Sequence, residues 1–265
     1  MKLTARNYFS RNANLEYFSV SQFKDFCKCP ACAMAKLNGE YDDSDSRALL
    51  LGSYVDEMLT GTSRSQKKFL EDNADELFQK NGKFYADVVK ANEAVARVLQ
   101  QPLMMKYLNG KHQTIMTGEI EGVPVKIKMD SYKPGEFVAD LKYLKSLRSP
   151  NMFENVVDYW GYPLQGAVYT EIVRQNTGET LPFFLVIATK ESPAHLAVCE
   201  VKPYNLEAEL NKVKANIRRF QAIKESKVEA ERCESYDCDY CTITQMLDEP
   251  IPHEQLGLSK KEIVL

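Results

Sequence analysis

Two aspartates and a lysine near the middle of the chain have the types and spacing that metal-dependent hydrolysis requires. Residues 125–130 alternate apolar and polar side chains and end in Asp130, and residues 137–142 are a second short run that ends in Asp140, Leu141 and Lys142. Both runs are typical of strands, in which side chains two positions apart share a face. Asp140 and Lys142 therefore point to the same side. If the two strands pair across the turn at Pro134 and Gly135, Asp130 lies beside Asp140.

Such a pair of carboxylates would bind a hard cation such as Mg²⁺. The cation would polarise a phosphodiester and activate water, and Lys142 would orient or deprotonate that water or stabilise the developing charge. The alternative is a strand face that merely carries surface charges. The chain has two further acid-x-Lys triplets, at 200–202 and 225–227. The first lacks an aspartate on the preceding strand, and the second falls on an expected helix, so 140–142 is the stronger candidate.

The elements that must position these residues predict an α/β (α+β) fold. The first half has helical spacing, a meander of three strands follows, and a helix, two strands and a long amphipathic helix complete the pattern. We expect helices at 19–37, 45–61, 63–81, 86–108, 163–175 and 206–223, and strands at 114–120, 125–130, 137–142, 181–189 and 195–202.

Length and composition limit the class of protein. A chain of 265 residues fits one large domain, or one domain with appendages. The net charge of −3 argues against a protein that coats nucleic acid indiscriminately, but it allows an enzyme with a local basic channel. No secretion signal and no apolar stretch of roughly 18 residues is visible, so we expect a cytoplasmic location and no membrane contact.

Six of the seven cysteines gather near the two ends of the chain. An odd number without an export signal argues against disulfides. Three close cysteines and one remote cysteine could supply four thiolates to Zn²⁺ or to a 4Fe–4S cluster. The alternative is a set of free buried thiols, which is what we expect of the isolated Cys199. The clustered cysteines are Cys27, Cys29, Cys32, Cys233, Cys238 and Cys241.

The order of these residues resembles that of the PD-(D/E)XK nuclease superfamily, and more narrowly its RecB-like and phage-type exonuclease branches. Residues 52–56, which end in Asp56, resemble the first helical motif, although many relatives have histidine at that last position. The remaining matches are Glu119 as an additional acidic ligand, Asp130 as the motif II aspartate, Asp140-Leu141-Lys142 as the (D/E)xK motif, and Gln165 and Tyr169 as the QxxxY motif.

This resemblance implies a restriction-endonuclease-like core, with a central mixed sheet flanked by helices and an N-terminal helical region. It implies a single nuclease domain over residues 1–245, with a helical part to about 110, a catalytic sheet core at 111–228, a Cys-rich segment at 233–241 and a tail at 246–265. The implied cofactor is Mg²⁺ or Mn²⁺. Its implied ligands are Asp130, Asp140, Glu119 and Asp56, and the implied catalytic residues are Asp130, Asp140, Lys142, Gln165 and Tyr169.

The wider match is similar to the exonuclease VIII (RecE) nuclease domain of phages and prophages. It implies digestion of linear double-stranded DNA from 5′ ends during recombination, a single-strand annealing partner and a homo-oligomeric ring. Some RecB-like nucleases hold an iron–sulfur cluster with one upstream and three downstream cysteines. The sequence around Cys29 resembles that upstream part, which makes Cys29 the first choice of ligand and Cys32 the second.

Two alternative functions remain open from the sequence. One is an iron–sulfur RecB-like nuclease of the CRISPR-associated or helicase-attached type. The other is a catalytically inactive, zinc-stapled module that binds DNA. The intact set of Asp130, Asp140 and Lys142 argues against the inactive module, because a degenerate site need not keep all three.

Overall fold

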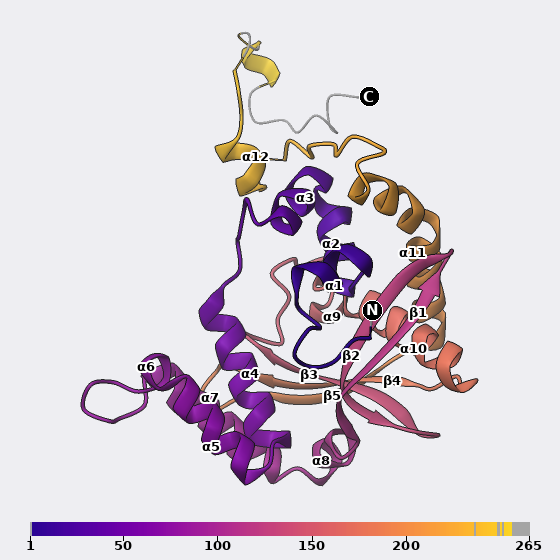
Figure 1. Cartoon of the computed structure of the whole chain (residues 1–265). Helices are drawn as coiled ribbons and strands as arrows, with labels where there is room; N and C mark the ends of the chain where they lie inside the picture. The colour runs from indigo at the N-terminus through magenta and orange to yellow at the C-terminus, as the bar shows by residue number, and fades with distance from the viewer. Residues whose placement is uncertain (1, 236, 248–249, 251, 256–265) are drawn as a thin grey trace. The chain divides into compact units, whose positions relative to one another are not determined.

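The computed structural model describes residues 2–235, 237–247, 250 and 252–255 (Figure 1). The predicted tail at 246–265 therefore lies largely outside the described residues. By its internal contacts the chain divides into two compact units. The first unit joins residues up to Asp43, Glu119–Val125 and the residues from Val213 on, and the second joins Ser44–Gly118 and Lys126–Lys212. The extent of a single domain over 1–245 stays a prediction.

A mixed five-stranded sheet in the order β1-β2-β3-β4-β5 forms the centre of the fold. The strand pairs β2–β3 and β4–β5 are antiparallel, whereas β3–β4 is parallel. Parallel neighbours need a crossover connection, which the two helices between β3 and β4 supply. The strands are β1 (Lys111–Ile120), β2 (Val123–Lys133), β3 (Phe137–Leu144), β4 (Phe183–Thr189) and β5 (Leu196–Val201).

Each compact unit contains its own set of helices, and one long helix contributes to both. The second unit contains α4 (Ser46–Thr60), α5 (Ser63–Asp72), α6 (Ala74–Leu77), α7 (Ala86–Leu99), α8 (Pro102–Leu108), α9 (Val156–Tyr159) and α10 (Tyr162–Thr177). The first unit contains α1 (Arg11–Glu16), α2 (Val20–Lys28), α3 (Pro30–Asn38), α12 (Asp239–Ile243) and the 3₁₀ turn His253–Gln255. The long helix α11 (Pro203–Lys224) contributes to both units. Within the described residues, none of these helices combines the length and apolar character that crossing a bilayer requires.

The register of β2 and β3 brings the two predicted aspartates to neighbouring positions. Ser131 lies opposite Ala139 in an antiparallel pair. The next residues along the two strands in this register are Asp130 and Asp140. The tight turn between the strands favours this register. A slip of one residue would also turn every apolar side chain to the wrong face.

The two faces of β3 are covered by different helices. Phe137, Ala139 and Leu141 are buried in a core cluster together with residues of α4, α7 and α8. Asp140 alternates with these residues and hydrogen-bonds to Gln165 of α10, so α10 covers the opposite face. Asp140 and Gln165 therefore meet between the sheet and α10.

Helix α10 approaches the sheet closely at Gly166. A Cβ atom at this position would lie 2.4 Å from the Phe183 Cδ1 atom of β4, which is far inside van der Waals contact. Glycine thus allows the helix backbone to pack directly on the strand. The adjacent Gln165 side chain can then reach the sheet.

Three of the predicted helices are wrong in their extent, and proline explains two of the breaks. The expected helix at 19–37 divides into α2 and α3, with Pro30 as the first residue of α3. The expected helix at 86–108 divides in the same way before Pro102, the first residue of α8. Proline disfavours helical geometry in the residue before it but suits the first turn of a helix. The expected helix at 63–81 divides into α5 and α6 at Asn73.

Candidate active site and cysteine cluster

Asp140 is the buried centre of the candidate active site. The residue is 2% exposed, and its Oδ1 accepts a hydrogen bond of 2.7 Å from Gln165 Nε2. Its Oδ2 lies 2.5 Å from Lys142 Nζ. The ammonium group of Lys142 also lies 4.8 Å from the centroid of the Tyr162 ring, a cation–π contact. Gln165 and Lys142 therefore fix both carboxylate oxygens of Asp140.

Asp130 is held by a different pair of donors. The backbone N–H of Leu141 donates to Asp130 Oδ2 at 3.0 Å, and Gln113 Nε2 donates to Asp130 Oδ1 at 3.2 Å. The same Gln113 nitrogen donates to Asp56 Oδ2 at 2.8 Å. The structure thus brings Asp56, on α4, to the carboxylate of Asp130.

The charges in this group do not balance. Burial, together with the charges of Asp140 and Asp56, raises the pKa of Asp130 well above its usual range. Burial also raises the pKa of Asp56. Burial alone would lower the pKa of Lys142, but Asp140 and Asp130 outweigh it and raise that pKa. Lys142 is therefore a cation beside Asp140 and Asp130, and the raised pKa values of Asp130 and Asp56 show that these two acids would gain from further positive charge.

The donor set fits a divalent cation. Carboxylate oxygens are the ligands that Mg²⁺ and Mn²⁺ prefer. Asp140 Oδ2 is buried and accepts no hydrogen bond of good geometry, its contact being the Lys142 ammonium. The Lys142 ammonium compensates the charge of this oxygen. Asp130 and Asp140, which are neighbours in the strand pair, are the carboxylates suited to hold a divalent cation, and Asp56 shares the Gln113 donor with Asp130.

Tyr169 and Glu119 take other positions. The Tyr169 hydroxyl donates to the backbone carbonyl of Lys128 at 2.9 Å, so this residue anchors α10 to β2. Glu119 is an exposed residue of β1 and belongs to the first compact unit. Its role as an additional metal ligand stays a prediction.

Gln113 is the site residue that sequence reasoning missed. It lies on β1 with a φ of +49°, in the left-handed region that non-glycine residues rarely adopt. The expected strand began one residue later, at 114. No spacing or motif in the sequence indicates such a conformation, so the sequence carries no signal for this residue.

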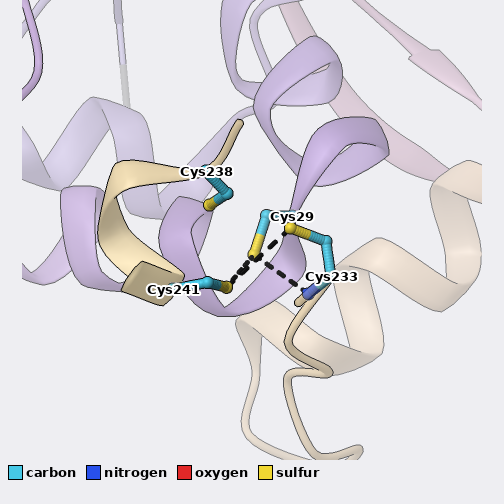
Figure 2. Close-up of side chains that lie close together, drawn as sticks. All are labelled: Cys29, Cys233, Cys238 and Cys241. Carbon is cyan, nitrogen blue, oxygen red and sulfur yellow. Dashed lines mark hydrogen bonds between the residues drawn. The ribbon is translucent and has the colours of Figure 1, made fainter. Parts of the chain in front are cut away.

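Four cysteines form a second candidate site in the first unit. The Sγ atoms of Cys29, Cys233, Cys238 and Cys241 all lie within 4.8 Å of one another. Figure 2 shows the four side chains turned toward a common point, with Cys238 and Cys241 carried by the α12 segment. The Sγ–Sγ distance is 3.7 Å from Cys29 to Cys241 and 3.8 Å from Cys233 to Cys241. This arrangement is suited to a metal ion or cluster with four thiolate ligands.

Two backbone N–H groups donate hydrogen bonds to a sulfur of the cluster, and one of them belongs to Cys32. The N–H groups of Cys32 and Cys233 donate to Cys29 Sγ at 3.5 and 3.4 Å. Cys32 is buried beside the cluster but is not among the four converging sulfurs. Burial raises the pKa of Cys233 to about 12 and that of Cys238 to about 11. These groups are therefore thiols at neutral pH until a cation replaces their protons.

Comparisons with known proteins agree with this geometry. Residues 19–244 match the family described as a PDDEXK-like domain of unknown function (DUF3799). The crystal structure of a "putative exonuclease" from Eubacterium rectale is 42% identical, with a TM-score of 0.87, and the match covers 97% of this chain and 99% of that chain. The crystal structure of SSO0001 is 11% identical with a TM-score of 0.35, over 82% of this chain and 88% of that chain, which is too distant to carry an argument. No curated protein matches the sequence.

These findings confirm two predictions, the membership of the PD-(D/E)XK superfamily and the α/β restriction-endonuclease-like fold with a mixed central sheet. The family match spans most of the chain and includes every residue placed in the two candidate sites. The chain belongs to the PDDEXK-like family DUF3799.

Proposed function

We propose that this protein is a metal-dependent deoxyribonuclease that hydrolyses phosphodiester bonds of DNA. The observation that carries the proposal is the buried Asp140 carboxylate, bound on one side by Lys142 and on the other by Gln165, with Asp130 next to it across the strand pair. The name of the E. rectale relative supports the exonuclease form of this activity. The full proposal is digestion of linear double-stranded DNA from 5′ ends with Mg²⁺ or Mn²⁺, in phage-type recombination.

Each residue has a separate part in the chemistry. Asp130 and Asp140, with Asp56, would hold the divalent cation, which when bound polarises the scissile phosphate and activates water. Lys142 keeps a positive charge beside Asp140 and is placed to orient water or to stabilise charge that develops on the phosphate. Gln165 holds the orientation of the Asp140 carboxylate.

A comparison of two acid-x-Lys triplets tests the proposal. Asp140→Asn should abolish the Mg²⁺-dependent loss of an end-labelled linear duplex. The control is Glu200→Gln, which alters the exposed ion pair between Glu200 of β5 and Lys202 just beyond it and should leave digestion unchanged. Circular dichroism and Tm check that both variants are folded. Digestion by Asp140→Asn at the wild-type rate would refute the assignment.

The choice of substrate tests the narrower parts of the proposal. Duplexes with a 5′-phosphate should be digested faster than duplexes with a 5′-hydroxyl, and circular duplexes should stay intact. Cleavage of circles would show an endonuclease instead. Equal DNA binding with and without Mg²⁺, together with no cleavage of any substrate, would favour the inactive DNA-binding module. The ring and the annealing partner belong to the same proposal, and light scattering tests the ring.

We infer further that the cysteine cluster holds a single Zn²⁺ ion rather than a 4Fe–4S cluster. A tetrahedral zinc ion with Zn–S bonds of about 2.3 Å places its thiolates about 3.8 Å apart. Two of the Sγ–Sγ distances, 3.7 and 3.8 Å, match this value, and all four Sγ atoms lie within 4.8 Å of one another. A 4Fe–4S cluster puts four irons and four sulfides between its thiolates, which must then stand farther apart.

Metal analysis of protein purified without oxygen distinguishes the two species. Zinc predicts one equivalent per chain and no visible absorbance, and Cys29→Ser should lower the zinc content. About four equivalents of iron with a broad visible band would overturn the inference. The matched control is Cys27→Ser, because Cys27 is exposed and lies two positions from Cys29.

A further inference from the structure

The side-chain amide of Gln113 occupies the point at which two carboxylates of the candidate site converge. Its Nε2 atom lies 2.8 Å from Asp56 Oδ2 and 3.2 Å from Asp130 Oδ1. An amide nitrogen carries two hydrogens, so it can donate one to each carboxylate. Asp56 and Asp130 come from α4 and β2, and Gln113 links them from β1.

The backbone of β1 is arranged for this contact. Gln113 has a φ of +49°, so it departs from the regular alternation of side chains along the strand. A non-glycine residue keeps such a conformation only where its surroundings determine it, and such residues gather at functional sites. The two hydrogen bonds to buried or half-buried acids are the surroundings that the structure provides here.

We propose that Gln113 is a positioning residue that holds Asp56 and Asp130 in the metal-free protein and yields its place when these two carboxylates share a cation. This inference rests on the proposed metal site. A cation such as Mg²⁺ binds carboxylate oxygens at about 2.0 to 2.1 Å. The Nε2 atom and a cation between the same two oxygens would overlap, so binding of the cation requires the amide to move.

Gln113 accordingly competes with metal at the same time as it keeps the acids in place. A variant without the amide should be less stable without metal, because two carboxylates near one another lose their shared donor. It should also bind metal more tightly, because no donor has to be displaced. A residue with a purely structural role would lower the stability equally in the two states.

The test is the dependence of Tm on Mn²⁺ concentration for the full-length protein and for Gln113→Leu. Two hydrogen bonds to charged acceptors lead us to expect a midpoint roughly 5- to 30-fold lower in Mn²⁺ for the variant. We also expect a lower Tm in chelator and a Tm close to that of the wild type at saturating Mn²⁺. The control is Gln175→Leu, since Gln175 donates to Glu171 on the exposed side of α10 and should not alter the midpoint.

Gln113→Glu provides a second measurement if the leucine variant does not fold. A fourth carboxylate should lower the Tm in chelator and again lower the Mn²⁺ midpoint. Equal midpoints for the wild type and both Gln113 variants would overturn the role of Gln113 while leaving the metal site in place. A wild-type Tm that does not respond to Mn²⁺ at all would overturn the metal site and this inference with it.

Discussion

Replacing Cys29 by serine should remove the largest part of the stability that a bound metal ion gives to the first unit. Cys29 is 204 positions from Cys233 and 212 positions from Cys241, so a metal that binds all of them closes a loop of most of the chain. In the chain-entropy model, a cross-link over about 200 residues destabilises the unfolded state by about 5 kcal/mol at 25 °C. Cys29 is the one ligand from the N-terminal side among the four converging cysteines, so its loss opens this loop.

The assay is urea unfolding with zinc present and again after chelation. The Cys29→Ser variant should lose about 5 kcal/mol of unfolding free energy when zinc is bound and much less after chelation. The exposed Cys27 provides the control, and Cys27→Ser should behave like the wild type in both conditions. An equal loss for Cys29→Ser with and without zinc would refute the reasoning, because the cysteine would then act through packing alone.

Three further changes test other parts of the structure. Burial lowers the pKa of Lys126 to about 8, so the folded chain binds this proton less tightly than the unfolded chain does. When the pH rises from 7 to 10, the unfolding free energy of the wild type should therefore increase by as much as about 3 kcal/mol relative to that of Lys126→Met, measured by urea titration. Phe153 is 89% exposed in the segment between Lys142 and Gln165. If its ring stacks on a base, Phe153→Ala should weaken the binding of single-stranded DNA by roughly 5- to 100-fold. The affinity is measured in EDTA by the fluorescence of the chain's single tryptophan, Trp160, and equal affinity of the variant and the wild type would exclude stacking. Gln165→Leu should reduce the digestion rate at saturating DNA by roughly 10- to 100-fold with little change in KM, because the amide of Gln165 orients the proposed metal ligand Asp140. An unchanged rate would show that Gln165 contributes to packing alone.

The neighbouring positions of the two aspartates could be predicted because local rules determine them. The alternation along residues 125–130 and the turn at Pro134 and Gly135 favour one antiparallel register, and the structure has Ser131 opposite Ala139 in that register. The helix boundaries were less predictable, although the first residue of α3 and of α8 is in each case a proline visible in the sequence. Helical spacing of apolar residues continues across such a break, so periodicity alone does not locate it.

The contacts made by Gln113 could not be predicted, because they depend on the three-dimensional arrangement. A left-handed residue in a strand leaves no trace in the pattern of residue types. The resemblance around Cys29 favoured this cysteine over Cys32, and the fold turns Cys29 toward Cys241. The sequence predicts which residues are available, and packing decides which of them meet.

Packing also sets the chemistry of the acid pair. Gly166 lets α10 lie directly on β4, and this contact brings the Gln165 amide to a carboxylate that the sheet has already buried. Gln165 and Lys142 thus contact both oxygens of a buried carboxylate. The two donors of Asp130 do not offset burial and the nearby acids, so the pKa of Asp130 is raised. A cation shared by the two carboxylates would favour the ionised form of Asp130.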